Sequence, residues 1–96
     1  MSYGLVIRKR AEKHADEIYH WYQNQRSGLG DDFLLCLEAI LFTINKNPLL
    51  FQVRYKHIHM AIVPRFPYGV FYFIDGERII VAAIFHLSRD PRLWKT

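Results

Sequence analysis

The chain contains a single cysteine, Cys36, and no long apolar run. One thiol cannot form an internal disulfide, which indicates a reducing compartment. No segment approaches the roughly 18 consecutive apolar residues that cross a bilayer. The first basic cluster follows a short apolar run, which is the reverse of the order in a signal peptide. We therefore expect a cytoplasmic protein with no membrane partner.

The sequence also lacks internal repeats, low-complexity tracts and linkers. Of its 96 residues, 51% are hydrophobic and 16% are aromatic. This composition is far from that of disordered chains, which have few apolar residues and a high charge. A chain of this length is large enough for one modest core but not for two. We expect residues 1–96 to form a single domain with one site.

Acidic residues are scarce in the second half of the chain. Residues 1–51 contain six Lys or Arg and six Asp or Glu, whereas residues 52–96 contain seven Lys or Arg and three Asp or Glu. The formal net charge of +4 therefore comes from the second half. An excess of this kind favours an anionic partner such as nucleic acid or an acidic peptide. An ordinary solubilising surface explains the charge equally well.

Two amphipathic helices are predicted in the first half. Apolar residues recur at helical spacing in two stretches, at Ala11, Ala15, Ile18 and Tyr22, and at Phe33, Leu37, Ile40, Leu41 and Ile44. Between them, 27–30 contains two glycines, which end helices and turn the chain. Asp31 and Asp32 then suit an N-cap and an acid in the first helical turn. Two helices joined by so short a loop form an antiparallel hairpin.

Strands are predicted on both sides of this hairpin. A short apolar run at 5–7 precedes it, and strand-like runs follow at 51–56, 58–63, 68–74 and 78–85. Asp75-Gly76 is a strong hairpin signal between the last two. Both runs are almost entirely apolar, so we expect central strands with two covered faces. The helices cover one face, and the tail at 87–94 or a partner covers the other. The predicted class is α+β: a short N-terminal strand, an antiparallel helix hairpin, then an antiparallel sheet, in two layers.

Metal and cofactor sites receive little support. His57 and His59 alternate along a predicted strand and so share one face, a spacing that could bind zinc. No second pair of ligands accompanies them. Cys36 shares a helical face with Phe33 and Ile40, which favours a buried residue over a nucleophile. We expect neither a metal nor a cofactor.

Aromatic and strand motifs follow one another in a fixed order. Paired aromatic residues, Trp21 and Tyr22, lie in the first predicted helix. The segment Arg-Phe-Pro-Tyr-Gly-Val-Phe-Tyr at 65–72 enters a strand, and Ile-Phe-His-Leu-Ser-Arg-Asp-Pro at 84–91 is followed by Trp94. In these features the chain resembles the RelE/ParE superfamily of small bacterial toxins. The Phe-Pro-Tyr entry and the His-x-x-Arg-Asp-Pro ending are similar to those of its ParE-like branch.

The resemblance implies a toxin of a type II toxin–antitoxin system. A cognate antitoxin would hold it inactive, with a flexible segment that binds as a helix in a groove or as an added strand. Operator DNA would be contacted only through the antitoxin. Partly exposed aromatic side chains are candidate antitoxin anchors, although core packing explains some of them equally well: Tyr19, Trp21 and Tyr22.

The resemblance leaves the target open, because ParE-like members inhibit DNA gyrase whereas RelE-like members cleave messenger RNA on the ribosome. RNA cleavage without a metal needs a base, an acid and a cation for the phosphate. Arg54, Arg65 and His86 are the candidate catalytic residues for that reaction. RelE-like nucleases tend to have an arginine where this chain has Gly69. This departure favours non-enzymatic inhibition of DNA gyrase, with the ribosome-dependent endoribonuclease as the alternative.

Several residues are candidates for contact with either target. They are basic or aromatic and lie in the predicted sheet or the tail: Lys56, Tyr68, Arg89, Arg92 and Trp94. Trp94 suits a lid over the sheet equally well. A third interpretation of Gly69 is a degenerate member that has lost its activity and persists as a DNA-associated or structural partner.

Overall fold

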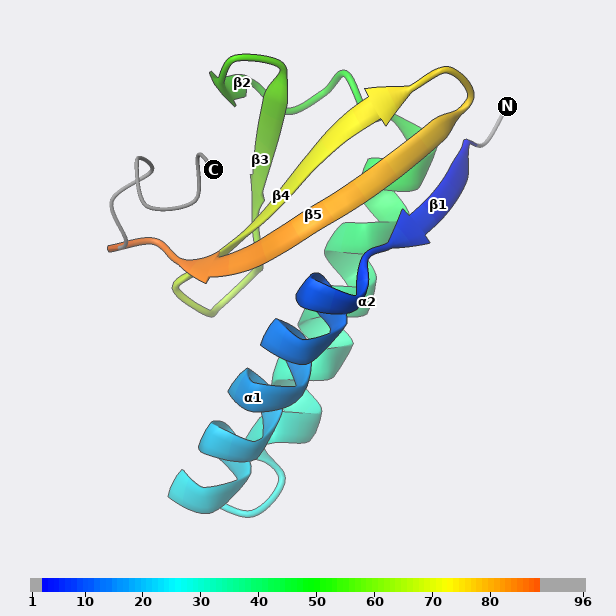
Figure 1. Cartoon of the computed structure of the whole chain (residues 1–96). Helices are drawn as coiled ribbons and strands as arrows, with labels where there is room; N and C mark the ends of the chain where they lie inside the picture. The colour runs from blue at the N-terminus through cyan, green and yellow to red at the C-terminus, as the bar shows by residue number, and fades with distance from the viewer. Residues whose placement is uncertain (1–2, 89–96) are drawn as a thin grey trace.

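The computed structural model describes residues 3–88, which form two helices and a five-stranded sheet. The elements in chain order are β1 (Gly4–Ile7), α1 (Lys9–Gln25), α2 (Leu29–Lys46), β2 (Val53–Tyr55), β3 (Ile58–Ile62), β4 (Tyr68–Asp75) and β5 (Arg78–His86). The strand order is β1-β5-β4-β3-β2, and the helices pack side by side against one face (Figure 1). The predicted α+β class is confirmed. Neither helix of this described part has the length and apolarity to cross a bilayer.

β1 pairs with β5 in parallel, a pairing on which the sequence made no prediction. The backbone N–H of Arg8 extends this pairing by donating to the carbonyl of Val81 at 3.1 Å. The chain then turns into α1, and the Nδ1 atom of His14 accepts a hydrogen bond from the backbone N–H of Ile84 at 3.1 Å. Beyond the end of β1, a side chain of α1 therefore provides a hydrogen-bond partner for the backbone at the edge of β5, since buried backbone groups require partners.

The start of α2 differs from the sequence prediction. Gly28 is the N-cap residue, and its φ of 89° lies in the left-handed region that glycine adopts without strain. Asp31 is therefore not the N-cap, and both Asp31 and Asp32 lie in the first turn. Their negative charge still suits the positive end of the helix dipole. The sequence analysis placed the start of the second helix too late, because it assigned the whole of 27–30 to a loop on account of its two glycines.

Gly30 lies inside α2 because the two helices meet closely there. A Cβ atom at this position would lie 2.5 Å from the carbonyl oxygen of Tyr19 and 2.6 Å from Cγ of Gln23. The side-chain oxygen of Gln23 accepts a hydrogen bond from the backbone N–H of Gly30 at 2.7 Å. This bond satisfies one of the N–H groups that the first turn of a helix leaves without a partner. The hairpin is thus held by a contact that only glycine permits.

The core between the helices and the sheet contains a cluster of aromatic rings. Phe33 of α2 is fully buried, and its ring centroid lies 5.9 Å from Tyr22, 5.4 Å from Phe66 and 5.8 Å from Tyr68. Tilted and edge-on rings at these distances attract one another in addition to burying apolar area. Tyr22, a predicted antitoxin anchor, is thus mainly a core residue.

His57 and His59 do not share a strand face. His57 lies in the turn before β3, where the alternation of a strand does not apply, and its ring contacts Phe73 at 5.3 Å. His59 is buried on the helix-facing side, where it stacks on Tyr72 at 5.1 Å. Its Nδ1 atom lies 2.7 Å from the carbonyl oxygen of Phe51. Among residues 3–88 no cluster of three or more potential metal ligands is present.

The sheet is apolar on both faces, as the sequence predicted for β4 and β5. Val70 and Tyr72 belong to the core under the helices, so Phe71 and Phe73 point to the opposite side of β4. Phe85 of β5 packs with Phe71 in a second buried cluster there. We call this side the outer face. The tail that we expected to cover it lies largely beyond residue 88, outside the described residues.

Candidate functional site

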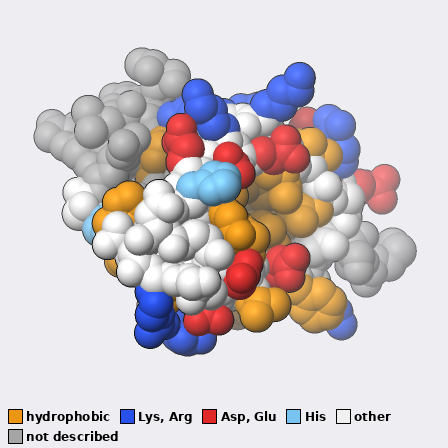
Figure 2. Space-filling view, turned by 90° about the horizontal axis from the view of Figure 1, so that it is seen from below, with side chains coloured by type: hydrophobic (Ala, Val, Ile, Leu, Met, Phe, Trp, Pro, Cys, Tyr) orange, Lys and Arg blue, Asp and Glu red, His pale blue; other side chains and the backbone are white. Residues whose placement is uncertain are grey.

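An apolar groove runs between α1, α2 and the sheet. Its volume is about 350 Å³, and the small, half-buried side chain of Ala15 leaves part of its floor open, beside the fully buried Ala11. The remaining apolar lining comes from Ile7, Leu34, Leu37, Leu41, Val81 and Ile84. Glu12 and Asp16 lie at the rim, and Figure 2 shows hydrophobic side chains lining a hollow with acidic side chains around it. Such a groove suits the apolar side of a helix or peptide.

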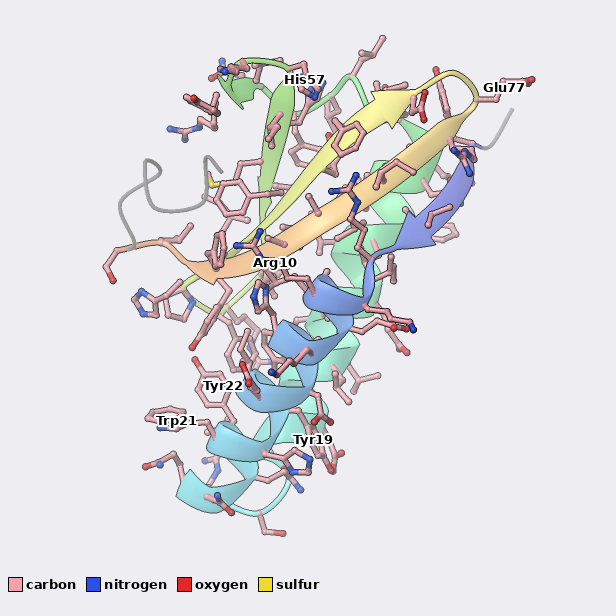
Figure 3. All side chains as sticks on the ribbon, in the orientation of Figure 1. Arg10, Tyr19, Trp21, Tyr22, His57 and Glu77 are labelled. Atoms are coloured by element: carbon pink, nitrogen blue, oxygen red, sulfur yellow. The ribbon has the colours of Figure 1, made fainter. Side chains whose placement is uncertain are left out.

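The three predicted antitoxin anchors do not form one surface. Tyr19 is half-buried and lines the groove. Trp21 is 56% exposed and contacts Tyr22, which belongs to the core. Figure 3 shows Tyr19 on one side of α1 and Trp21 and Tyr22 on the other. Only Tyr19 therefore faces the groove.

A second recess, of about 340 Å³, lies where β5 ends beside α1. His86 pairs with Tyr68 across the two strands, and their ring centroids are 5.2 Å apart. The Nδ1 atom of His86 accepts a hydrogen bond from the backbone N–H of Ser88 at 3.1 Å. His14 and Glu17 of α1 complete the polar lining. Burial raises the pKa of Tyr68, so its phenol stays protonated at neutral pH.

Neither Arg54 nor Arg65 lines this recess. Arg54, on β2, lines a different recess with Met60 and Ile62. Arg65 lies in the loop between β3 and β4, where its guanidinium carbon is 6.0 Å from the ring centroid of Phe66. Met60 packs on the outer face, whereas His86 contacts Tyr68 on the side of the helices. The structure therefore does not bring the three candidate catalytic residues together.

Gly69 occupies a closed position on β4. A Cβ atom there would lie 2.9 Å from both Cγ and Sδ of Met60 and 3.3 Å from Cδ2 of Leu87. Any larger side chain requires Met60 to move, although that side chain is flexible. The side chains of Met60 and Leu87 thus fill the space that an arginine at this position would need.

The residues predicted to contact a target are only partly described. Lys56 is exposed in the turn after β2, with its Nζ atom 5.5 Å from the ring centroid of Tyr55. Tyr68 is half-buried between the core and His86. The remaining three lie outside the described residues: Arg89, Arg92 and Trp94.

Three residues of the first half were missed by the sequence analysis. Arg8 and Arg10 lie over rings of the outer face, and His14 lines the recess beside His86. The charge count concealed the two arginines, because acids on the helices balance their charge without forming ion pairs with them in the described structure. The position of His14 carries no local signal, since its partner Ile84 is 70 residues away in sequence.

Solved structures with a similar fold include two toxin–antitoxin assemblies. A chain of the chromosomal ParDE system from P. aeruginosa has a TM-score of 0.79 and 13% identity, and the match covers 88% of this chain and 96% of that one. A chain of the toxin–antitoxin complex RelBE2 from Mycobacterium tuberculosis has a TM-score of 0.67 and 15% identity, covering 90% and 99%. At these identities the likeness shows the shared fold.

Sequence comparison identifies the family. No curated protein sequence matches the chain. Residues 5–91 match the model of a family described as the ParE toxin of the type II toxin–antitoxin system parDE. This match includes both helices, strands β2 to β5, and all of β1 except Gly4. The chain therefore belongs to the ParE toxin family, within the RelE/ParE superfamily of type II toxin–antitoxin systems.

Proposed function

We propose that this toxin inhibits DNA gyrase in the cytoplasm by binding rather than by catalysis. The observation that carries the proposal is the separation of Arg54 from His86, which line different recesses. Phosphodiester cleavage requires a cation and an acid or base at the same phosphate. Gly69 adds to this argument, because no cationic side chain projects from this position near the start of β4.

One observation favours the ribonuclease as the second candidate. The recess beside His86 contains residue types that transfer protons, namely His14, Glu17 and Tyr68. No lysine or arginine of the described residues lines it. Within residues 3–88, developing negative charge on a phosphate in this recess would therefore lack a cationic partner.

Induction of the chain in bacteria separates the two candidates. Incorporation of labelled thymidine is expected to fall before incorporation of labelled leucine. The combined variant Arg54→Ala, Arg65→Ala and His86→Ala should arrest growth as the parent does, because these residues are not expected to act on a substrate. Purified protein should inhibit supercoiling by gyrase. Leucine incorporation that falls first, together with loss of arrest in the variant, would contradict gyrase inhibition and support RNA cleavage.

The groove between the helices is the proposed site for a cognate antitoxin. The two similar solved structures are toxin–antitoxin assemblies, and an antitoxin of this chain would place apolar side chains over Ala15. Glu12 and Asp16 favour a segment whose apolar residues are flanked by Lys or Arg. An amphipathic helix provides both features.

Filling the groove should weaken neutralisation. Ala15→Phe places a large ring in the open floor, so the dissociation constant of the antitoxin should rise about tenfold or more. Ala39→Phe is the matched control, because Ala39 is exposed on α2 and does not line the groove. Titration calorimetry with the antitoxin encoded beside this chain gives both constants. Equal affinities for the two variants would exclude the groove as the antitoxin site.

A further inference from the structure

The outer face of the sheet holds exposed cationic side chains on aromatic rings. The guanidinium carbon of Arg8 lies 5.1 Å from the ring centroid of Phe73, and that of Arg10 lies 5.2 Å from Phe85. His57 contacts Phe73 from its edge at 5.3 Å. Arg8 and His57, which are far apart in sequence, therefore converge on the ring of Phe73. In Figure 3 Arg10 lies beside β5 and His57 beside the top of β3.

Lys56 extends this set across the sheet. It lies over Tyr55, which packs in the same cluster as Phe71 and Phe85. Lys56 and Arg10 are both exposed although the rings below them are partly or fully buried. The charged groups thus form an outer layer on an apolar floor, where their attraction to the rings limits their motion.

These cations have no acidic partners among the described residues. The two ion pairs of residues 3–88 are His20 with Asp16 and Arg78 with Asp75, and neither includes Arg8, Arg10 or Lys56. The acids of the first half lie on the helices, with Glu12 at the rim of the groove. The tertiary structure therefore makes the outer face positive, although the first half of the chain contains as many acidic as basic residues.

We propose that the outer face binds single-stranded nucleic acid through Arg8, Arg10 and Lys56. Phosphate groups match the unpaired guanidinium and ammonium groups, and the half-buried rings of Phe73 and Tyr55 suit contact with unpaired bases. An acidic peptide would use the charges but not the rings. The inference does not depend on gyrase inhibition, since nucleic-acid binding is measured on the isolated protein without gyrase.

The test is fluorescence anisotropy with labelled oligonucleotides of about 15 nucleotides. Single-stranded DNA and single-stranded RNA form two arms, and a duplex of the same sequence and polyglutamate are competitors. Arg8→Ala with Arg10→Ala should weaken binding about tenfold or more, and the slope of log K against log salt should fall by roughly 0.7 for each contact removed. Lys56→Asn should act in the same direction, because asparagine tolerates the positive φ of 51° at this position.

Lys46→Ala is the matched control. Lys46 also lies over an aromatic ring, Phe42, with its Nζ atom 5.0 Å from the centroid, but on α2 and away from the outer face. This variant should bind as the parent does, since it removes the same charge elsewhere. No binding at low salt, equal loss in the Lys46 variant, or tighter binding of the duplex or polyglutamate would each overturn the proposal. If the double arginine variant does not fold, the affinity of the Lys56→Asn variant for the oligonucleotide tests the proposal instead.

Discussion

Phe33→Ala is expected to lower the free energy of unfolding by about 3–5 kcal/mol. Phe33 is fully buried, and the three rings that surround it come from α1, the loop before β4, and β4 itself. These partners cannot all move inward, because each is fixed by a different element. The variant therefore loses both the transfer free energy of the ring and the contacts around the cavity that remains. Urea denaturation followed by circular dichroism measures the change.

Phe42→Ala provides the comparison on the same helix. Phe42 is 63% exposed, and its one described ring contact is with the Lys46 ammonium. Its replacement should cost at most about 1 kcal/mol. Similar losses in the two variants would mean that the aromatic cluster does not hold the helices to the sheet.

Alkaline pH is expected to destabilise the protein through Tyr72. This side chain is fully buried in the core, and burial raises its pKa from 10.0 to about 12. Below pH 10 the phenol is protonated in both the folded and the unfolded chain, so its contribution to stability is fully present. Between pH 10 and 12 the unfolded chain releases the proton while the folded chain retains it. Stability is therefore lost as pH rises, by about 2 kcal/mol at pH 12 from this group.

Tyr72→Phe separates this effect from the other titrating groups. The hydroxyl of Tyr72 donates a hydrogen bond to the carbonyl of Pro48 at 2.6 Å, so its removal leaves a buried acceptor without a partner. The variant should be less stable at neutral pH by about 1–3 kcal/mol, yet less sensitive to alkali. Burial also raises the pKa of Tyr22 and of Tyr68, which leaves a weaker dependence of the same sign in the variant. Parallel curves of unfolding free energy against pH would refute the role of Tyr72.

Much of the fold could be predicted from the sequence because its signals are local. Apolar spacing predicted both helices, and Asp75-Gly76 predicted the β4–β5 hairpin, since a turn and its flanking strands are contiguous. Gly30 shows where local reasoning fails. Its neighbours in the sequence favour a loop, but the carbonyl of Tyr19 requires glycine within a helix.

The candidate site was less predictable than the fold. The motifs around Phe66-Pro67-Tyr68 and His86 indicated the family correctly. The grouping of Arg54 with His86 depended on which strand faces converge, and the strand order placed them in separate recesses. Side-chain direction alternates along each strand, so residue type and approximate position do not determine which groups meet.

The sequence by itself determined the helix hairpin, the central strands and membership of the ParE toxin family, because periodicity, turn residues and motifs are all encoded over short stretches. Only the tertiary structure decided that β1 pairs in parallel with β5 and that His14 completes that edge. It also decided that Arg8 and Arg10 lie with Lys56 on one face. The reason is physical: these contacts join segments tens of residues apart, and their geometry depends on the packing of the whole chain rather than on any local preference.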